Sequence, residues 1–136
     1  MDGSKAIEKT RNWVESFVVG LGLCPFAERV CRTETLKYVL CESSEAADVL
    51  KELSQQLLKL SAAPRNEIET MLLVFPNALK EFLDFNDFME ITESLVSDLK
   101  LEGVIQIVGF HPAYQFAETQ AEAPENYTNR SPYPTL

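Results

Sequence analysis

The sequence predicts a single α/β domain in which a small, largely parallel sheet of three strands is packed with helices. Two observations support this fold class. Three short runs rich in strand-forming residues are separated by long amphipathic segments, and parallel strands require such helical crossovers. The 136 residues can bury one hydrophobic core and not two, so we expect residues 1–136 to form one domain. A ferredoxin-like α+β fold with a mixed sheet is the alternative that the pattern leaves open.

The N-terminal part is predicted to form two helices. Apolar residues recur at helical spacing over residues 5–19, which indicates one amphipathic helix. The two glycines that follow are typical of a helix end, because glycine readily adopts the left-handed conformation found there. Proline is favoured at the first position of a helix, so we expect Cys24 to cap a short second helix that begins at Pro25 and reaches about Cys31.

Three strands and two long helices are predicted next. Residues 36–40 are rich in strand formers, and residues 70–75 are apolar on both faces, as a buried central strand should be. Residues 104–110 form the third predicted strand. Apolar residues at helical spacing predict one helix that begins near residues 43–45 and reaches residue 60, and another over residues 80–99.

The composition excludes several classes of protein. The formal net charge of −9 repels phosphate backbones and no basic patch is visible, so no nucleic-acid partner is expected. No apolar run approaches the roughly 20 residues of a membrane span, so no membrane partner is expected. The three scattered cysteines and the single histidine fit reduced thiols in a cytoplasm better than a disulfide framework or a zinc site. No glycine-rich nucleotide-binding motif occurs, and we expect neither metal nor cofactor.

Polar residues follow each of the three predicted strands. In an open parallel sheet, ligands bind outside the carboxyl ends of the strands. Those ends lead here into Ser43 and Ser44, into Asn77, and into His111. A parallel sheet would therefore gather these residues on one edge, and that edge is where we expect a site.

His111 is the first candidate for chemistry. It is the one side chain whose unperturbed pKa lies near neutrality, which makes it a candidate general acid or base. A histidine at a strand end can instead bond to the backbone and orient the loop that follows. Both interpretations stay open at this point.

Cys24 is the second candidate. A thiol at a helix N-terminus lies at the positive end of the helix dipole, which favours the nucleophilic thiolate. The neighbouring glycines could let backbone N–H groups face an anionic substrate. Free cysteine is more commonly a small buried hydrophobic residue, and Leu23 and Phe26 beside it favour burial.

The chain from residue 111 onward is the third candidate region. It holds four of the seven prolines and few aliphatic residues, so we expect an irregular loop there. Arg130 is suited to bidentate capture of a carboxylate or a phosphate. Composition alone favours the simpler interpretation, a surface arginine in a rigid turn.

Several longer strings occur together: GLGLCPFA (20–27), ETMLLVFP (69–76), DFNDFME (84–90), EGVIQIVGFHPAYQFAET (102–119) and NYTNRSPYP (126–134). In this order they resemble the bacterial family catalogued as domain of unknown function 1415. That family has no assigned activity, so the resemblance implies no reaction. It implies that CPFA, FHP with YQFA, and TNRSPYP are hallmark segments, which gives weight to His111, Tyr114, Asn129 and Arg130.

The resemblance also bears on the end of the chain. Members of the family typically continue past the SPYP string into a further helical segment, whereas this sequence stops at Leu136. The prolines at positions 132 and 134 resemble a turn that introduces another element. We therefore expect a chain that is truncated at its C-terminus.

Two hypotheses for function follow. The first is a small cytoplasmic enzyme that acts on an anionic small molecule. In that enzyme His111 is the acid/base and Cys24 is a less favoured nucleophile. Its substrate-binding residues are Arg130, Asn129 and Tyr114. The second hypothesis is a non-catalytic ligand-binding or protein-interaction domain that uses the same loop to hold a ligand or a partner, and neither hypothesis fixes an oligomeric state.

Overall fold

The computed structural model describes residues 3–136. The chain is α/β, with α1 (Gly3–Trp13), a π-helix (Val14–Val19), α2 (Pro25–Arg32), β1 (Leu36–Leu40), α3 (Ala46–Ala62), β2 (Thr70–Val74), α4 (Phe82–Asp98) and a 3-10 helix (Pro124–Asn129). β1 coincides with its predicted range, and β2 ends one residue before its predicted end. Both long helices also lie within about two residues of their predicted bounds, which is the usual uncertainty of a helix end.

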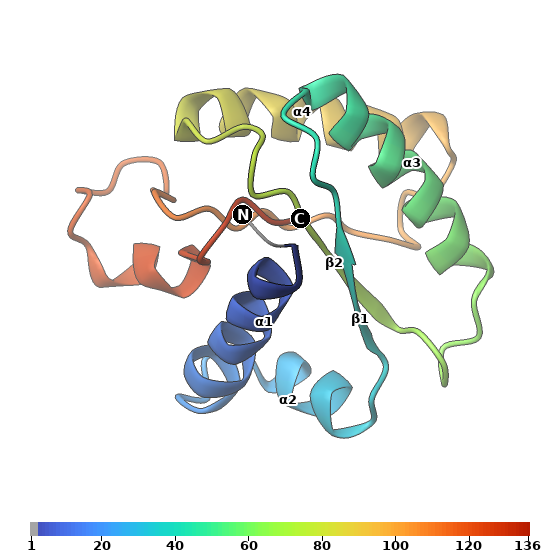
Figure 1. Ribbon diagram of the computed structural model, residues 1–136, viewed down its shortest axis with the longest axis horizontal. Helices are drawn as coiled ribbons and strands as arrows, with labels where there is room; N and C mark the ends of the chain where they lie inside the picture. The colour runs from blue at the N-terminus through green and yellow to red at the C-terminus, as the bar shows by residue number, and fades with distance from the viewer. Residues whose placement is uncertain (1–2) are drawn as a thin grey trace.

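The sheet lies between two layers of helices (Figure 1). α3 and α4 cover one face, where Leu73 and Phe75 enter the main core. α1 covers the other face, where Ala6 packs with Val74. Successive residues of a strand point to opposite faces, so β2 supplies apolar side chains to both layers. This arrangement explains why its sequence is apolar throughout.

The two strands pair in parallel, as the sequence predicts. Leu36 lies opposite Thr70, and Leu40 lies opposite Val74. α3 is the crossover that connects the end of β1 to the start of β2, as a parallel pair requires. The carboxyl ends of both strands therefore lie at the same edge.

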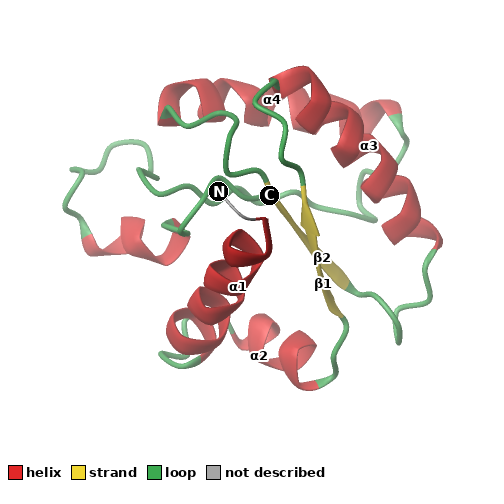
Figure 2. Ribbon diagram, viewed as in Figure 1, coloured by secondary structure: helices red, strands yellow, loops and turns green. Residues whose placement is uncertain are grey.

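The three-stranded sheet is not confirmed. Among residues 3–136 the sheet holds two strands, and residues 104–110 run as an extended loop, drawn green in Figure 2. Phe110 at the end of this segment forms an isolated antiparallel bridge with Thr135, and Thr135 in turn bridges to Val74 of β2. Strand-forming composition was correct about the extended backbone and wrong about its pairing.

The C-terminal residues explain the difference. Leu73 and Leu136 exchange backbone hydrogen bonds of 2.8 and 3.0 Å, and the Phe75 N–H donates to the Pro134 carbonyl at 3.0 Å. These residues run antiparallel to β2 and occupy the position beside it that the sequence analysis assigns to residues 104–110. The 104–110 segment is therefore held one strand spacing further from β2.

The first predicted helix is divided, and its two glycines differ in role. α1 continues into the π-helix, which ends at Val19. Gly22 has a φ of +65° and is the left-handed stop that glycine favours. Gly20 has an ordinary helical φ of −59°. A Cβ at Gly20 would collide with the Ser16 carbonyl, so close packing and not a left-handed backbone requires glycine there.

Candidate functional site

The carboxyl edge of the sheet brings together the polar residues that follow the strands. The Asn77 side-chain amide donates to the Glu42 carbonyl at 2.9 Å. The Ser43 hydroxyl accepts from the Glu45 N–H at 3.1 Å and donates to a carboxylate oxygen of Asp48 at 2.6 Å, which organises the start of α3. Each of these groups is used within the edge itself, so the edge is a set of internal turn contacts.

His111 lies at this edge and is buried, with 1% of its surface exposed. Its Nδ1 accepts a hydrogen bond from the Ala113 N–H at 3.0 Å. The Nε2 nitrogen lies 3.0 Å from the Leu79 carbonyl oxygen. A carbonyl oxygen can only accept a hydrogen bond, so Nε2 must carry the proton and the ring is the neutral Nε2–H tautomer. Burial lowers the pKa of His111, against weaker opposing contributions from backbone contacts and Glu81. The imidazole is thus a neutral link between two chain segments.

Aromatic rings enclose this imidazole. The ring centroids of Phe82 and Phe85, both on α4, lie 5.5 and 5.0 Å from that of His111. The Leu79 backbone that receives the bond has a φ of +53°, which is strained for a branched side chain. His111 therefore holds a strained turn against the start of α4.

Arg130 ties together the loop formed by residues 111–130, hereafter the C-terminal loop. Its Nε donates to the Tyr114 carbonyl at 3.0 Å, and its Nη2 donates to the Ala121 carbonyl at 2.5 Å. Its guanidinium carbon lies 4.5 Å from the centroid of the Tyr127 ring. Carbonyl groups from two turns therefore receive two of the five N–H donors of the guanidinium that the sequence analysis assigns to an anion.

Asn129 and Tyr114 belong to the same network. The Asn129 side-chain amide donates to the Gly109 carbonyl at 3.1 Å, and its backbone carbonyl accepts from the His111 N–H at 3.0 Å. The Tyr114 ring packs against Phe82, with centroids 5.2 Å apart. Burial raises the pKa of the Tyr114 hydroxyl. The structure thus brings four predicted site residues, His111, Tyr114, Asn129 and Arg130, into one compact loop.

Asn126 is the buried centre of this loop, a role that the sequence analysis missed. Its side chain is fully buried, its Oδ1 accepts from the Phe116 N–H at 2.7 Å, and its Nδ2 donates to the Gln120 carbonyl at 2.8 Å. Asparagine side chains commonly form hydrogen bonds to backbone groups in irregular segments. The position of Asn126 in a proline-rich loop was therefore the sequence signal that could have indicated this role.

Cys24 lies apart from that loop. It precedes α2 with an extended backbone and is half-buried, as the sequence predicts for a residue at the helix start. Within residues 3–136, no hydrogen bond or ring contact joins Cys24 to His111 or Arg130. Leu23 and Phe26, which the sequence analysis takes to favour burial of Cys24, are themselves 40% and 45% exposed.

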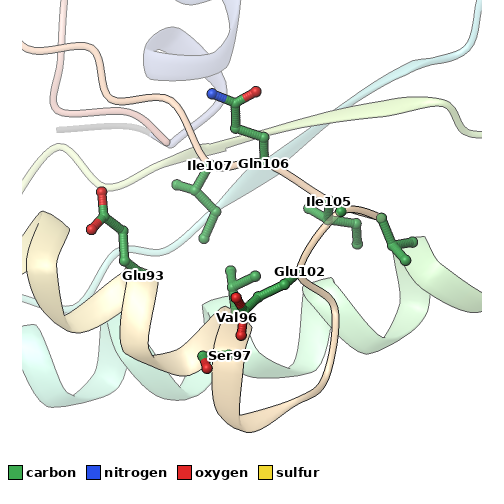
Figure 3. A pocket seen from close by; sticks show the side chains of 9 residues that line it. Glu93, Val96, Ser97, Glu102, Ile105, Gln106 and Ile107 are labelled. Atoms are coloured by element: carbon green, nitrogen blue, oxygen red, sulfur yellow. The ribbon is translucent and has the colours of Figure 1, made fainter.

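A surface hollow lies between α4 and residues 102–107, and we call it the α4 groove (Figure 3). It is open and has a volume of about 610 Å³. Ile105 and Ile107 point into it from the extended segment, and Val96 lies at its base. The carboxylates of Glu93 and Glu102 lie at its border. The sequence analysis missed this groove because it predicted residues 104–110 to be a strand paired within the sheet.

The second hollow, of about 360 Å³, lies at the opposite, amino edge of the sheet. Arg29 holds Glu69 with two hydrogen bonds of 2.7 Å, and Arg65 adds a third at 3.0 Å. The bond from Arg29 is the main reason that the pKa of Glu69 is lowered. This ion network connects α2 to the start of β2, which is a structural role.

The family described as "Protein of unknown function (DUF1415)" matches residues 5–136. The chain belongs to this family. The resemblance inferred from its motifs is thereby confirmed, and the chain matches no curated protein and no solved structure.

The three strings that mark this DUF1415 chain have different places in the structure. CPFA begins α2, FHP carries His111 and the turn after it, and TNRSPYP runs from the 3-10 helix to the residues that pair with β2. Two of the three therefore build the C-terminal loop and its attachment to the sheet. Within residues 3–136, no helix combines the length and the apolar character that a membrane crossing requires.

Proposed function

We propose that this DUF1415 protein is a non-catalytic protein-interaction domain. The observation that carries the proposal is the state of His111. Both of its ring nitrogens are held by backbone groups, and the ring is enclosed by aromatic side chains. A general acid or base must reach the proton it transfers, and a buried, doubly bonded imidazole does not offer a nitrogen for that purpose.

The other candidate residues support the same conclusion. Arg130 directs two of its N–H groups to loop carbonyls, and Asn129 bonds to Gly109 and to the backbone of His111. These bonds make the loop rigid from within. The enzyme hypothesis, with Cys24 as its less favoured nucleophile, stays a prediction that no contact in the structure supports.

The α4 groove is the surface on which a partner is expected. It combines an apolar base with two carboxylates, and interaction surfaces commonly combine an apolar centre with a polar rim. It also borders an extended backbone segment, whose peptide groups can bond to a partner chain. We infer that a polypeptide, not a small metabolite, is the ligand.

A selection from a phage-displayed library of random 12-residue peptides tests this function. Ser97 lines the groove and is exposed, so Ser97→Trp fills the groove without disturbing the core. Ser94→Trp is the matched control, because Ser94 is exposed on the same helix and does not line the groove. We expect enriched peptides that bind the wild type and Ser94→Trp equally and bind Ser97→Trp at least tenfold more weakly.

Two results would contradict the proposal. A selection that enriches no peptide over an unrelated acidic domain would argue against an interaction domain. Enriched peptides that bind Ser97→Trp as tightly as the wild type would place the binding surface elsewhere.

A further inference from the structure

Residues 105–108, which follow a turn that ends at Val104, form an extended loop with a strand-forming sequence, yet they lie outside the sheet (Figure 1). Phe110 is fixed by two hydrogen bonds to Thr135, of 2.8 and 2.9 Å. Within residues 3–136, the backbone groups of Gln106, Ile107 and Val108 form no hydrogen bond. An extended chain with unbonded N–H and C=O groups can accept another strand.

The side chains of this segment alternate as those of a strand do. Ile105 and Ile107 point toward α4 and into the groove, whereas Gln106 points away from it (Figure 3). Val104 and Val108 are exposed, with 70% and 46% of their surface accessible. An added strand would find apolar neighbours on both faces, because cross-strand pairs of β-branched residues stabilise strand pairing.

The charges around the segment restrict its partner. Glu93 on α4 and Glu102 in the turn before the segment both line the groove, and no Lys or Arg does so. The chain carries a formal net charge of −9. A second copy of this acidic chain would place carboxylates near carboxylates, whereas a cationic partner would be attracted.

We propose that the α4 groove receives an extended, cationic and apolar segment of another protein, which adds as a strand beside residues 105–108. Alternate apolar side chains of that segment pack on Val96, Ile105 and Ile107. Its Lys or Arg residues face Glu93 and Glu102. This assignment rests on the proposed interaction function and gives the partner its chemistry.

Three synthetic peptides test the proposal by fluorescence anisotropy with the full chain. The first is a seven-residue peptide that alternates Val with Lys or Arg. The second has the same side chains and N-methyl groups on alternate backbone nitrogens, which removes its strand hydrogen bonds. The third replaces each cationic residue with Glu. We expect the first to bind, the second to bind at least tenfold more weakly, and the third to show no saturable binding.

Two charge variants define the electrostatic contribution. Glu93→Lys with Glu102→Lys reverses the groove charges, and we expect it to prefer the acidic peptide over the cationic one. Asp87→Lys with Glu90→Lys is the matched control, because both residues are exposed on α4, lie outside the groove and give the same change in net charge. The control should weaken binding of the cationic peptide by no more than about threefold, the effect of exposed charges at a distance.

Hydrogen exchange locates the added strand. The bound cationic peptide should slow amide exchange at Gln106–Val108 and leave the Cys24 region unchanged. Equal affinity of the N-methylated peptide would overturn strand addition while the interaction function stood. Self-association that Ser97→Trp abolishes would assign the groove to a second copy and overturn the proposed partner. Failure of both this peptide set and the library selection would count against the interaction function itself.

Discussion

Replacing His111 with leucine should destabilise the fold, because the imidazole links the chain at Ala113 to the strained turn at Leu79. Leucine keeps most of the packing against the α4 rings, so the main loss is two hydrogen bonds of 3.0 Å. Each bond contributes about 1 kcal/mol net, and the half-buried Leu79 carbonyl left without a donor adds about 1–2 kcal/mol. The expected loss is therefore about 3–4 kcal/mol, a large part of the roughly 5–15 kcal/mol that stabilises a domain.

Urea denaturation at pH 7.5 measures this loss as a change in the free energy of unfolding. Gln115→Ala is the control, because Gln115 is exposed in the same loop and donates a single bond, to the Thr119 carbonyl. The control should stay within about 0.5 kcal/mol of the wild type, as surface changes usually do. A His111→Leu variant as stable as that control would refute the structural role of the imidazole.

Three further predictions concern other parts of the chain. Asn126→Ala should speed proteolysis within the C-terminal loop by about tenfold or more, because it removes the amide that holds the loop; unchanged cleavage would contradict this. The folded-state pKa of Glu69 is lowered, chiefly by its bond to Arg29, so its stabilising effect is present above its unfolded pKa and is lost as pH falls through the folded value. Glu69→Gln should then lower the melting temperature at pH 7, and the difference from the wild type should shrink as the pH falls through the folded-state pKa of Glu69; a difference that does not change with pH would argue against the ion network. Gly22→Ala should lower the free energy of unfolding by about 1 kcal/mol, because alanine is disfavoured at the positive φ of this position. Gly20→Ala should lower it by more, because the added Cβ would collide with the backbone of Ser16. The reverse order of the two losses in urea denaturation would contradict these roles.

Local pattern was sufficient to predict α2, α3, α4 and the two strands, but not the change from α1 to the π-helix or the 3-10 helix over Pro124–Asn129. β1 lies between clear breaks and is rich in strand formers, so it could be recognised from its own residues although its partner β2 is distant in the sequence. The third strand failed because pairing is not a local property. Residues 104–110 have the composition of a strand, yet Thr135 and its neighbours take the place beside β2. The prolines at 132 and 134 suggested a loop, although proline is compatible with an edge or bridging position.

The candidate site was predicted in position and not in role. Parallel topology correctly placed Asn77 and His111 at the carboxyl edge, because strand ends follow from strand direction. The bond from His111 to Leu79 depends on a φ of +53° at a leucine, which no sequence rule anticipates. The α4 groove depends on the absence of a paired strand, so it could not be found while residues 104–110 were predicted to pair within the sheet.

The account depends most directly on the claim that His111 is a neutral structural imidazole. Nitrogen-15 NMR of the ring measures its tautomer and its protonation as pH is lowered from 7.5 to 5.5. Burial lowers the pKa of His111, so we expect a protonated Nε2 and an unprotonated Nδ1, with no midpoint near the ordinary value of about 6.5. A ring that titrates with a midpoint at or above about 6.5, or that carries its proton on Nδ1, would contradict the account and favour the enzyme hypothesis.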